Sequence, residues 1–195
     1  KIPGMCALIE GQVRHLARMV EDLLDVSRLS TGKLRLNRSP VDILHILNNA
    51  VEDCATLVSV KHLQVEIDIP QTSLMVDGDP IRIAQIFTNV ITNAAKYTPC
   101  GGCIALRVAV EADAVHVVIS DNGIGISAQA LPVIFDAYFQ DAQAIGFNGS
   151  GLGIGLTVVR ELVEAHGGSV RGSSEGVGKG SQFTLTFPLL KTQSE

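Results

Sequence analysis

Four glycines at alternate positions, followed at once by a helical pattern, constrain the fold of this 195-residue chain more than any other feature. They run from Gly149 to Gly155, and an amphipathic pattern then continues to His166. Successive glycines leave backbone amides accessible, and a helix N-terminus carries about half a positive charge. The segment therefore predicts a phosphate cradle. Two commoner phosphate motifs are excluded, since no G-x-G-x-x-G follows a strand and Gly178-Lys179 lacks the remaining P-loop residues.

Composition limits the classes of partner. Hydrophobic residues make up 46% of the chain, enough for a substantial core. The net charge is -5 and the 15 Lys and Arg residues are scattered, so we expect no binding to nucleic acid. The longest uncharged stretch, residues 142–159, holds five glycines and predicts a loop entering a helix, not a membrane span. No signal peptide is recognised, so we expect a cytoplasmic domain without membrane contact, although an anchor upstream remains open.

A helix beginning at Asp79-Pro80 and stopped by Pro99 carries two distinct faces. The core face consists of Ile83, Phe87, Val90, Ile91 and Ala94. The neighbouring polar face consists of Gln85, Asn89, Asn93 and Lys96. Taken alone, this polar stripe is equally consistent with a solvated surface. However, asparagine costs about 0.7 kcal/mol inside a helix, whereas an amide oxygen suits Mg²⁺ and a lysine suits phosphate.

A second candidate site feature follows an apolar strand that ends in Asp121. Gly123 and Gly125 come next, and glycine allows the backbone to approach a flat ligand closely. A buried carboxylate there can accept a hydrogen bond from an exocyclic amine. An ordinary turn is the alternative for this short motif.

Together these motifs resemble the Bergerat-type ATP-binding fold of sensor histidine kinases, type II topoisomerases, the 90-kDa heat-shock chaperone and mismatch-repair ATPases. Residues 39–190 are most similar to the histidine kinase branch. The similar segments are the N box at 89–99, the first glycine box at 121–125, the F box at 134–140, the second glycine box at 149–156 and a closing glycine segment at 178–183. Ala137 departs from the family, which usually has proline there.

The resemblance implies that ATP and Mg²⁺ bind between the Asn89 helix and a lid spanning about residues 136–151. Asp121 would bind the adenine amine, and Asn93, with Asn89, would hold Mg²⁺. Lys96 and Tyr97 would contact the phosphate or ribose side. The full set implied as ATP-binding is Asn89, Asn93, Lys96, Tyr97, Asp121, Gly123, Gly125, Ile126, Phe135, Ser150, Gly151, Leu152, Gly153, Gly155, Leu156 and Thr184. In this set Phe135 would anchor the lid and Thr184 would reach the base pocket from the last strand.

Position 89 favours a kinase over a hydrolase. In the ATPase branches of the resembled fold, a glutamate there activates water, and the amide of Asn89 cannot accept that proton. The resemblance thus implies a histidine protein kinase that feeds the receiver domain of a response regulator. Three alternatives remain: a nucleotide-sensing module without kinase activity, an anti-sigma-factor type serine kinase, and a chaperone-like ATPase.

The N-terminal part predicts a separate helix. An apolar seam over residues 5–29 steps by four and three, and Gly32 follows as a helix end. The segment resembles the second helix of a dimerisation and phosphotransfer domain, which implies a homodimer through 5–29 and docking with the protein's own phosphotransfer domain. The phosphorylated histidine, followed by an acid and a nearby proline, is absent. The histidines lacking this pattern are His15, His45, His62, His116 and His166.

These patterns predict an α+β fold. We expect a two-layer sandwich with a mixed, largely antiparallel sheet of about five strands, covered on one face by three helices and preceded by a long helix. The predicted helices are 41–62, 80–98 and 155–166, and the predicted strands are 63–69, 104–110, 114–120, 169–172 and 181–188. The expected division is a partial phosphotransfer helix at 1–32, a linker at 33–40 and an ATP-binding domain at 41–191.

Overall fold

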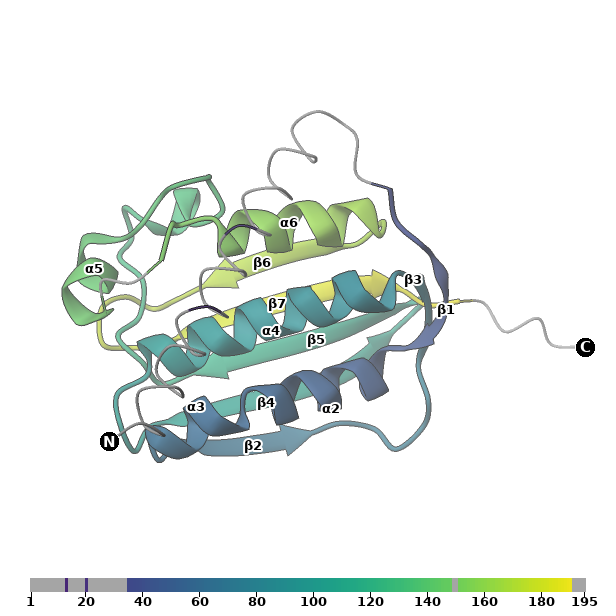
Figure 1. Cartoon of the computed structure of the whole chain (residues 1–195), viewed down its shortest axis with the longest axis horizontal. Coiled ribbons are helices and arrows are strands. Elements are labelled where there is room, and N and C mark those ends of the chain that lie inside the picture. The colour runs from purple at the N-terminus through teal and green to yellow at the C-terminus, as the bar shows by residue number, and fades with distance from the viewer. Residues whose placement is uncertain (1–12, 14–19, 21–34, 149–150, 191–195) are drawn as a thin grey trace, which may run out of the picture.

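A computed structural model describes residues 13, 20, 35–148 and 151–190 (Figure 1). The helices are α2 (Ile43–Asp53), α3 (Ala55–Val60), α4 (Pro80–Tyr97), α5 (Ala142–Asn148) and α6 (Gly155–Ala165), with a 3-10 turn at Leu131–Val133. The strands are β1 (Ser39–Asp42), β2 (Gln64–Asp68), β3 (Met75–Gly78), β4 (Cys103–Glu111), β5 (Ala114–Asp121), β6 (Ser169–Ser173) and β7 (Ser181–Pro188). The predicted helix over 5–29 and most of the predicted linker lie outside the described residues.

The larger sheet has five strands in the order β2-β4-β5-β7-β6. Only the β2–β4 pair is parallel; the other three pairs are antiparallel. Helices α2, α4 and α6 lie side by side over one face of this sheet (Figure 1). The predicted α+β sandwich, with a mixed five-stranded sheet and three helices on one face, is confirmed.

The core lies between helices α2, α4 and α6 and the larger sheet, with α4 over its middle. Val115, Val117 and Ile119 alternate along β5 and are fully buried beneath the helices. From the helix side, Phe87 meets Phe187 of β7 edge to face, with ring centroids 6.2 Å apart. Because α4 is central, its buried face is held rigidly, and the positions of its polar side chains follow from this packing.

Two sequence predictions were wrong. The single helix expected over 41–62 is strand β1 followed by α2 and α3, because Asp42 ends the strand and caps α2 by accepting a hydrogen bond from the Leu44 amide at 3.1 Å. The expected lid also contains a helix, α5, which starts after Asp141, whose Oδ1 accepts from the Gln143 amide at 3.2 Å. Missed aspartate caps account for where α2 and α5 begin, whereas the interruption at Cys54 between α2 and α3 has no side-chain cap.

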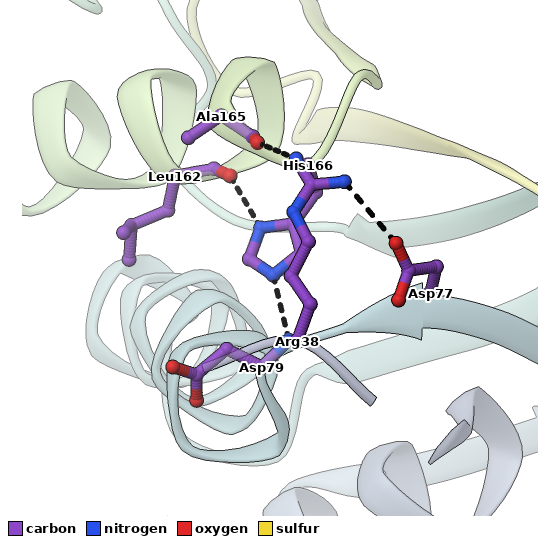
Figure 2. Close-up of polar contacts among 6 residues, drawn as sticks. All are labelled: Arg38, Asp77, Asp79, Leu162, Ala165 and His166. Carbon is purple, nitrogen blue, oxygen red and sulfur yellow. Dashed lines mark hydrogen bonds and ion pairs between the residues drawn. The ribbon is translucent and has the colours of Figure 1, made fainter. Parts of the chain in front are cut away.

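The segment before β1 is tied to two helix ends (Figure 2). The Asn37 amide donates to Asp79 at 2.9 Å, where α4 begins. Arg38 donates to the carbonyl oxygen of Ala165 at the end of α6 and pairs with Asp77 at 3.5 Å. Beneath them, His166 accepts a hydrogen bond from the Asp79 amide at 3.0 Å. These contacts fix where the chain joins the sandwich.

Among the helices of the described residues, none has the length and apolar character needed to cross a membrane.

Candidate nucleotide site

Helix α4 brings the predicted polar stripe to a cavity. The Asp79 carboxylate caps the helix by accepting from the amides of Ile81 (3.0 Å) and Arg82 (3.3 Å), and Pro80 follows at the first helical position. The helix ends at Thr98, whose hydroxyl donates to the Ala94 carbonyl. A cavity of about 470 Å³ lies along its polar side. The α4 residues expected in the site and lining this cavity are Asn89, Asn93, Lys96 and Tyr97.

Asp121, at the end of β5, lines the same cavity. Its Oδ2 accepts a hydrogen bond from the Ser181 hydroxyl at 2.6 Å, and its Oδ1 accepts one from the Gly123 amide at 2.8 Å. Burial raises the pKa of the Asp121 carboxyl above its ordinary value, while the hydrogen bonds from Ser181 and Gly123 act in the opposite direction. The carboxylate is thus half-buried and held in one orientation.

The turn after Asp121 requires its glycines. A Cβ at Gly123 would lie 2.5 Å from the carbonyl oxygen of Tyr97. Gly125 has φ +70°, and a Cβ there would lie 2.0 Å from the carbonyl oxygen of Gly176. Gly125 and Ile126 line the cavity, whereas Gly123 supports the turn from outside it.

The glycine-rich segment closes the cavity on another side. Gly153 has φ +70° and its carbonyl accepts from the Tyr138 amide at 2.9 Å, while Gln140 Nε2 donates to the Gly151 carbonyl at 2.7 Å. Ser150, also expected here, lies outside the described residues. The lining residues of this segment are Gly151, Leu152, Gly153, Ile154, Gly155 and Leu156. The start of α6 therefore faces the same space as Asp121 and the amide stripe.

A known family accounts for this arrangement. The model of the family described as histidine kinase-, DNA gyrase B-, and HSP90-like ATPase matches residues 78–191. The chain belongs to this ATPase family. The matched range contains every segment of the cavity described above, and the resemblance to a histidine kinase catalytic domain is confirmed.

Relatives of this ATPase domain include named sensor proteins. The sensor protein ChvG of Agrobacterium fabrum is 36% identical over 197 residues, covering 95% of this chain and 33% of ChvG. The sensor histidine kinase WalK of Bacillus subtilis is 28% identical over 195 residues, covering 99% of this chain and 32% of WalK. The chain thus spans about a third of the length of these curated relatives. The solved structure of full-length ShkA in complex with AMPPNP has a TM-score of 0.79 at 26% identity, covering 98% of this chain and 40% of that one.

Besides Gly123, two residues expected in the site of this ATPase domain do not line the cavity. Phe135 packs edge to face on Phe183, with ring centroids 6.3 Å apart, and so lies behind the cavity wall. Thr184 points to the opposite face of the sheet, because side chains alternate along β7 and its neighbour Phe183 faces the helices. The predicted placement of Thr184 in the base pocket is therefore wrong; Ser181 and Phe183 line the cavity from this strand.

Several lining residues were missed from the sequence. Leu57 and Lys61 come from α3 and the residue after it, where no motif marks them. Gln140, Asp141 and Ala144 come from the lid, and the cap at Asp141 was the available signal for a helix there. The remaining missed residues are Thr92, Ala94, Ile124, Ile134, Phe139, Ile154, Ser181 and Phe183.

The donor set fits a magnesium nucleotide. Asn89 Nδ2 is buried and has no hydrogen-bond partner, so one end of this amide awaits a ligand group or water. Within the described ranges, no group of three or more His, Cys, Asp or Glu side chains forms a metal site. A cation in this cavity would therefore depend on amide oxygens and on the oxygens of a bound phosphate, a combination that Mg²⁺ accepts.

Proposed function

We propose that this ATPase-family domain binds Mg²⁺-ATP and transfers the γ-phosphoryl group to a histidine on a phosphotransfer helix. One observation carries the proposal: Asp121 and the amides Asn89 and Asn93 line one cavity with the glycine segment before α6. The similarity to ShkA, whose structure holds AMPPNP, supports a nucleotide in this cavity.

In this proposal the two ends of the cavity have different roles. The Asp121 carboxylate accepts a hydrogen bond from the adenine amine, and Gly125 lets the chain pass close to the ring beside Ile126. At the other end, the amide oxygens of Asn93 and Asn89 hold Mg²⁺, which neutralises phosphate charge when bound.

Phosphate binding is assigned to backbone amides and to α4. The amides at Gly151 and Gly153 and those at the start of α6 cradle the phosphates, aided by the helix dipole. Lys96 and Tyr97 contact the phosphate or ribose side. Phosphoryl transfer depends mainly on positioning and charge neutralisation, so the domain needs no further catalytic side chain of its own.

Asn89 favours transfer to a histidine over hydrolysis. Its amide accepts no proton from water, so bound ATP is kept for an acceptor brought by the phosphotransfer domain. We further propose that the acceptor passes its phosphoryl group to a response regulator receiver domain, that residues 5–29 contribute to a homodimer, and that the domain acts in the cytoplasm. A nucleotide-sensing module without kinase activity is the alternative.

The test combines nucleotide binding with phosphoryl transfer. Calorimetry with ADP and Mg²⁺ is followed by transfer from labelled ATP to a separately purified dimerisation domain that carries the acceptor histidine. We expect Asn93→Ala and Asp121→Asn each to reduce transfer by at least tenfold, while the exposed Asn48→Ala and Asp68→Asn serve as matched controls. Binding without transfer would favour the sensing module, and absence of binding would overturn the proposal.

A further inference from the structure

Lys61 lies where three parts of the cavity wall meet. It follows α3, and Figure 1 shows α3, α5 and the C-terminal end of α4 at the same end of the molecule. The ammonium donates to the carbonyl oxygens of Ala95 (2.8 Å), Lys96 (2.8 Å) and Thr98 (2.5 Å). Its own carbonyl accepts from the Gly101 amide at 2.9 Å. Lys61 thus caps the end of α4 with its side chain and holds the turn after the helix with its backbone carbonyl.

These hydrogen bonds exclude a direct contact between Lys61 and a phosphate, but they leave the positive charge of Lys61 at the end of α4. A lysine ammonium has three N–H donors, and three carbonyls take all of them. Lys61 therefore lines the cavity without a donor to spare for a phosphate, unlike the direct contacts proposed for Lys96. Its positive charge remains, however, and it faces the last carbonyls of α4, where a cation stabilises the helix.

The Lys61 ammonium also contacts a residue of α5. The Lys61 Nζ lies 5.5 Å from the ring centroid of Phe147, within the range of a cation–π interaction. Ala144, one turn earlier in α5, lines the cavity together with Lys61. Burial lowers the pKa of the Lys61 ammonium, while the nearby Cys100 acts in the opposite direction.

We infer that Lys61 is a positioning residue that holds α5 over the cavity by joining Phe147 to the C-terminal end of α4. The inference rests on the proposed function for its effect on nucleotide, but the contact itself exists without one. A residue that served only as a helix cap would stabilise α4 and leave α5 unaffected, and this difference provides the test.

The first measurement is amide hydrogen exchange of α5 in the nucleotide-free protein. Lys61→Met removes the charge and keeps the apolar stem, and we expect faster exchange over residues 142–148. Phe147→Leu removes the ring and should do the same, while the double variant should exceed neither single variant by more than experimental error. Lys61→Arg should restore slow exchange. Ile145→Ala on the exposed side of α5 and Arg107→Met on β4 are the controls.

The second measurement is the dissociation rate of a fluorescent ADP. We expect Lys61→Met and Phe147→Leu to raise this dissociation rate about twofold to fivefold, the range of one exposed cation–π contact, and Lys61→Arg to restore it. Unchanged exchange over α5 in both variants would overturn the inference, as would additive effects in the double variant. If Lys61→Met fails to fold, Phe147→Leu alone decides the result. Failure of the unaltered protein to bind ADP would instead contradict the proposed function, since the exchange experiment uses no nucleotide.

Discussion

The Nε2 atom of His166 accepts a hydrogen bond from the backbone amide of Asp79, 87 residues away in the chain. The other ring nitrogen, Nδ1, lies 2.6 Å from the Leu162 carbonyl oxygen and donates to it. This pair of partners fixes the neutral tautomer, with the proton on Nδ1. One buried imidazole therefore joins the start of α4 to the end of α6, the two helices that carry the amide stripe and the glycine cradle (Figure 2).

His166→Phe should lower the free energy of unfolding by about 1–3 kcal/mol, since the Asp79 amide would be buried without an acceptor. Urea denaturation followed by circular dichroism measures the change. His45→Phe, on the exposed side of α2, is the matched control and should stay within about 0.5 kcal/mol of the parent. Equal stability of the two variants would show that the buried hydrogen bond is dispensable.

The same histidine should make stability depend on pH. Burial lowers the pKa of His166 below 6.5, and Arg38 acts in the same direction, while the Leu162 carbonyl, Asp79 and Asp77 oppose them. The unfolded chain therefore binds the proton more readily than the native state. The stabilising contribution is complete above pH 6.5 and is lost as the pH falls below that value. We expect the urea midpoint to drop on acidification in the parent and to drop less in His166→Phe.

Gly180→Ala should displace the backbone at Asp121 in the candidate site. Gly180 has φ +71°, and a Cβ there would lie 1.9 Å from the carbonyl oxygen of Asp121, so the backbone of both strands must shift. We expect a loss of more than about 1 kcal/mol in stability, together with weaker ADP binding. Calorimetric titration and urea denaturation measure the two effects.

Gly146→Ala is the control for the stability measurement on Gly180→Ala. Gly146 lies inside α5 with nothing within 4 Å of an added Cβ, so alanine should favour the helix by about 1 kcal/mol locally. If Gly180→Ala bound ADP as tightly as the parent, the site would tolerate a shift of the Asp121 backbone and the prediction would be contradicted.

Purified domain, assayed without a separate acceptor domain, should hydrolyse ATP far more slowly than the roughly 1–100 s⁻¹ of kinase turnover, because position 89 is an amide. Phosphate release, assayed with Mg²⁺-ATP over hours, measures this rate. Rapid turnover that Asn93→Ala abolishes would identify a hydrolase and contradict the kinase proposal.

Much of the fold could be predicted because local signals were strong. The Asp79-Pro80 cap and Pro99 predicted both ends of α4 to within one or two residues. The alternation of apolar and polar residues located the five strands of the larger sheet. The small sheet of β1 and β3 was missed, since each strand has only four residues and their pairing joins distant segments. Short strands of this kind depend on tertiary pairing and leave little periodicity in the sequence.

The candidate site was predictable where a motif carried it and not elsewhere. Asn93, Asp121 and Gly153 stood in motifs, and all three line the cavity. The prediction for Thr184 was wrong because successive side chains of a strand face opposite sides of the sheet, so Thr184 points away from the cavity that Phe183 lines. Lys61 had no motif, since its importance comes from three carbonyls that exist only after α4 has formed.

Strand β3 pairs with the chain at both ends of the described domain. Ser39 of β1 pairs with Gly78, and Leu189 bridges to Val76, so residues leading in and out lie beside the same short strand. Asp121 and Ser181 meet at the other end of β5 and β7, seven residues along the strand from Ala114 and Pro188, or roughly 20 Å away. Chain segments joined before Ser39 and after Leu190 would therefore enter and leave beside β3, at the opposite end of β5 and β7 from Asp121, so the domain suits exchange between chimeric proteins.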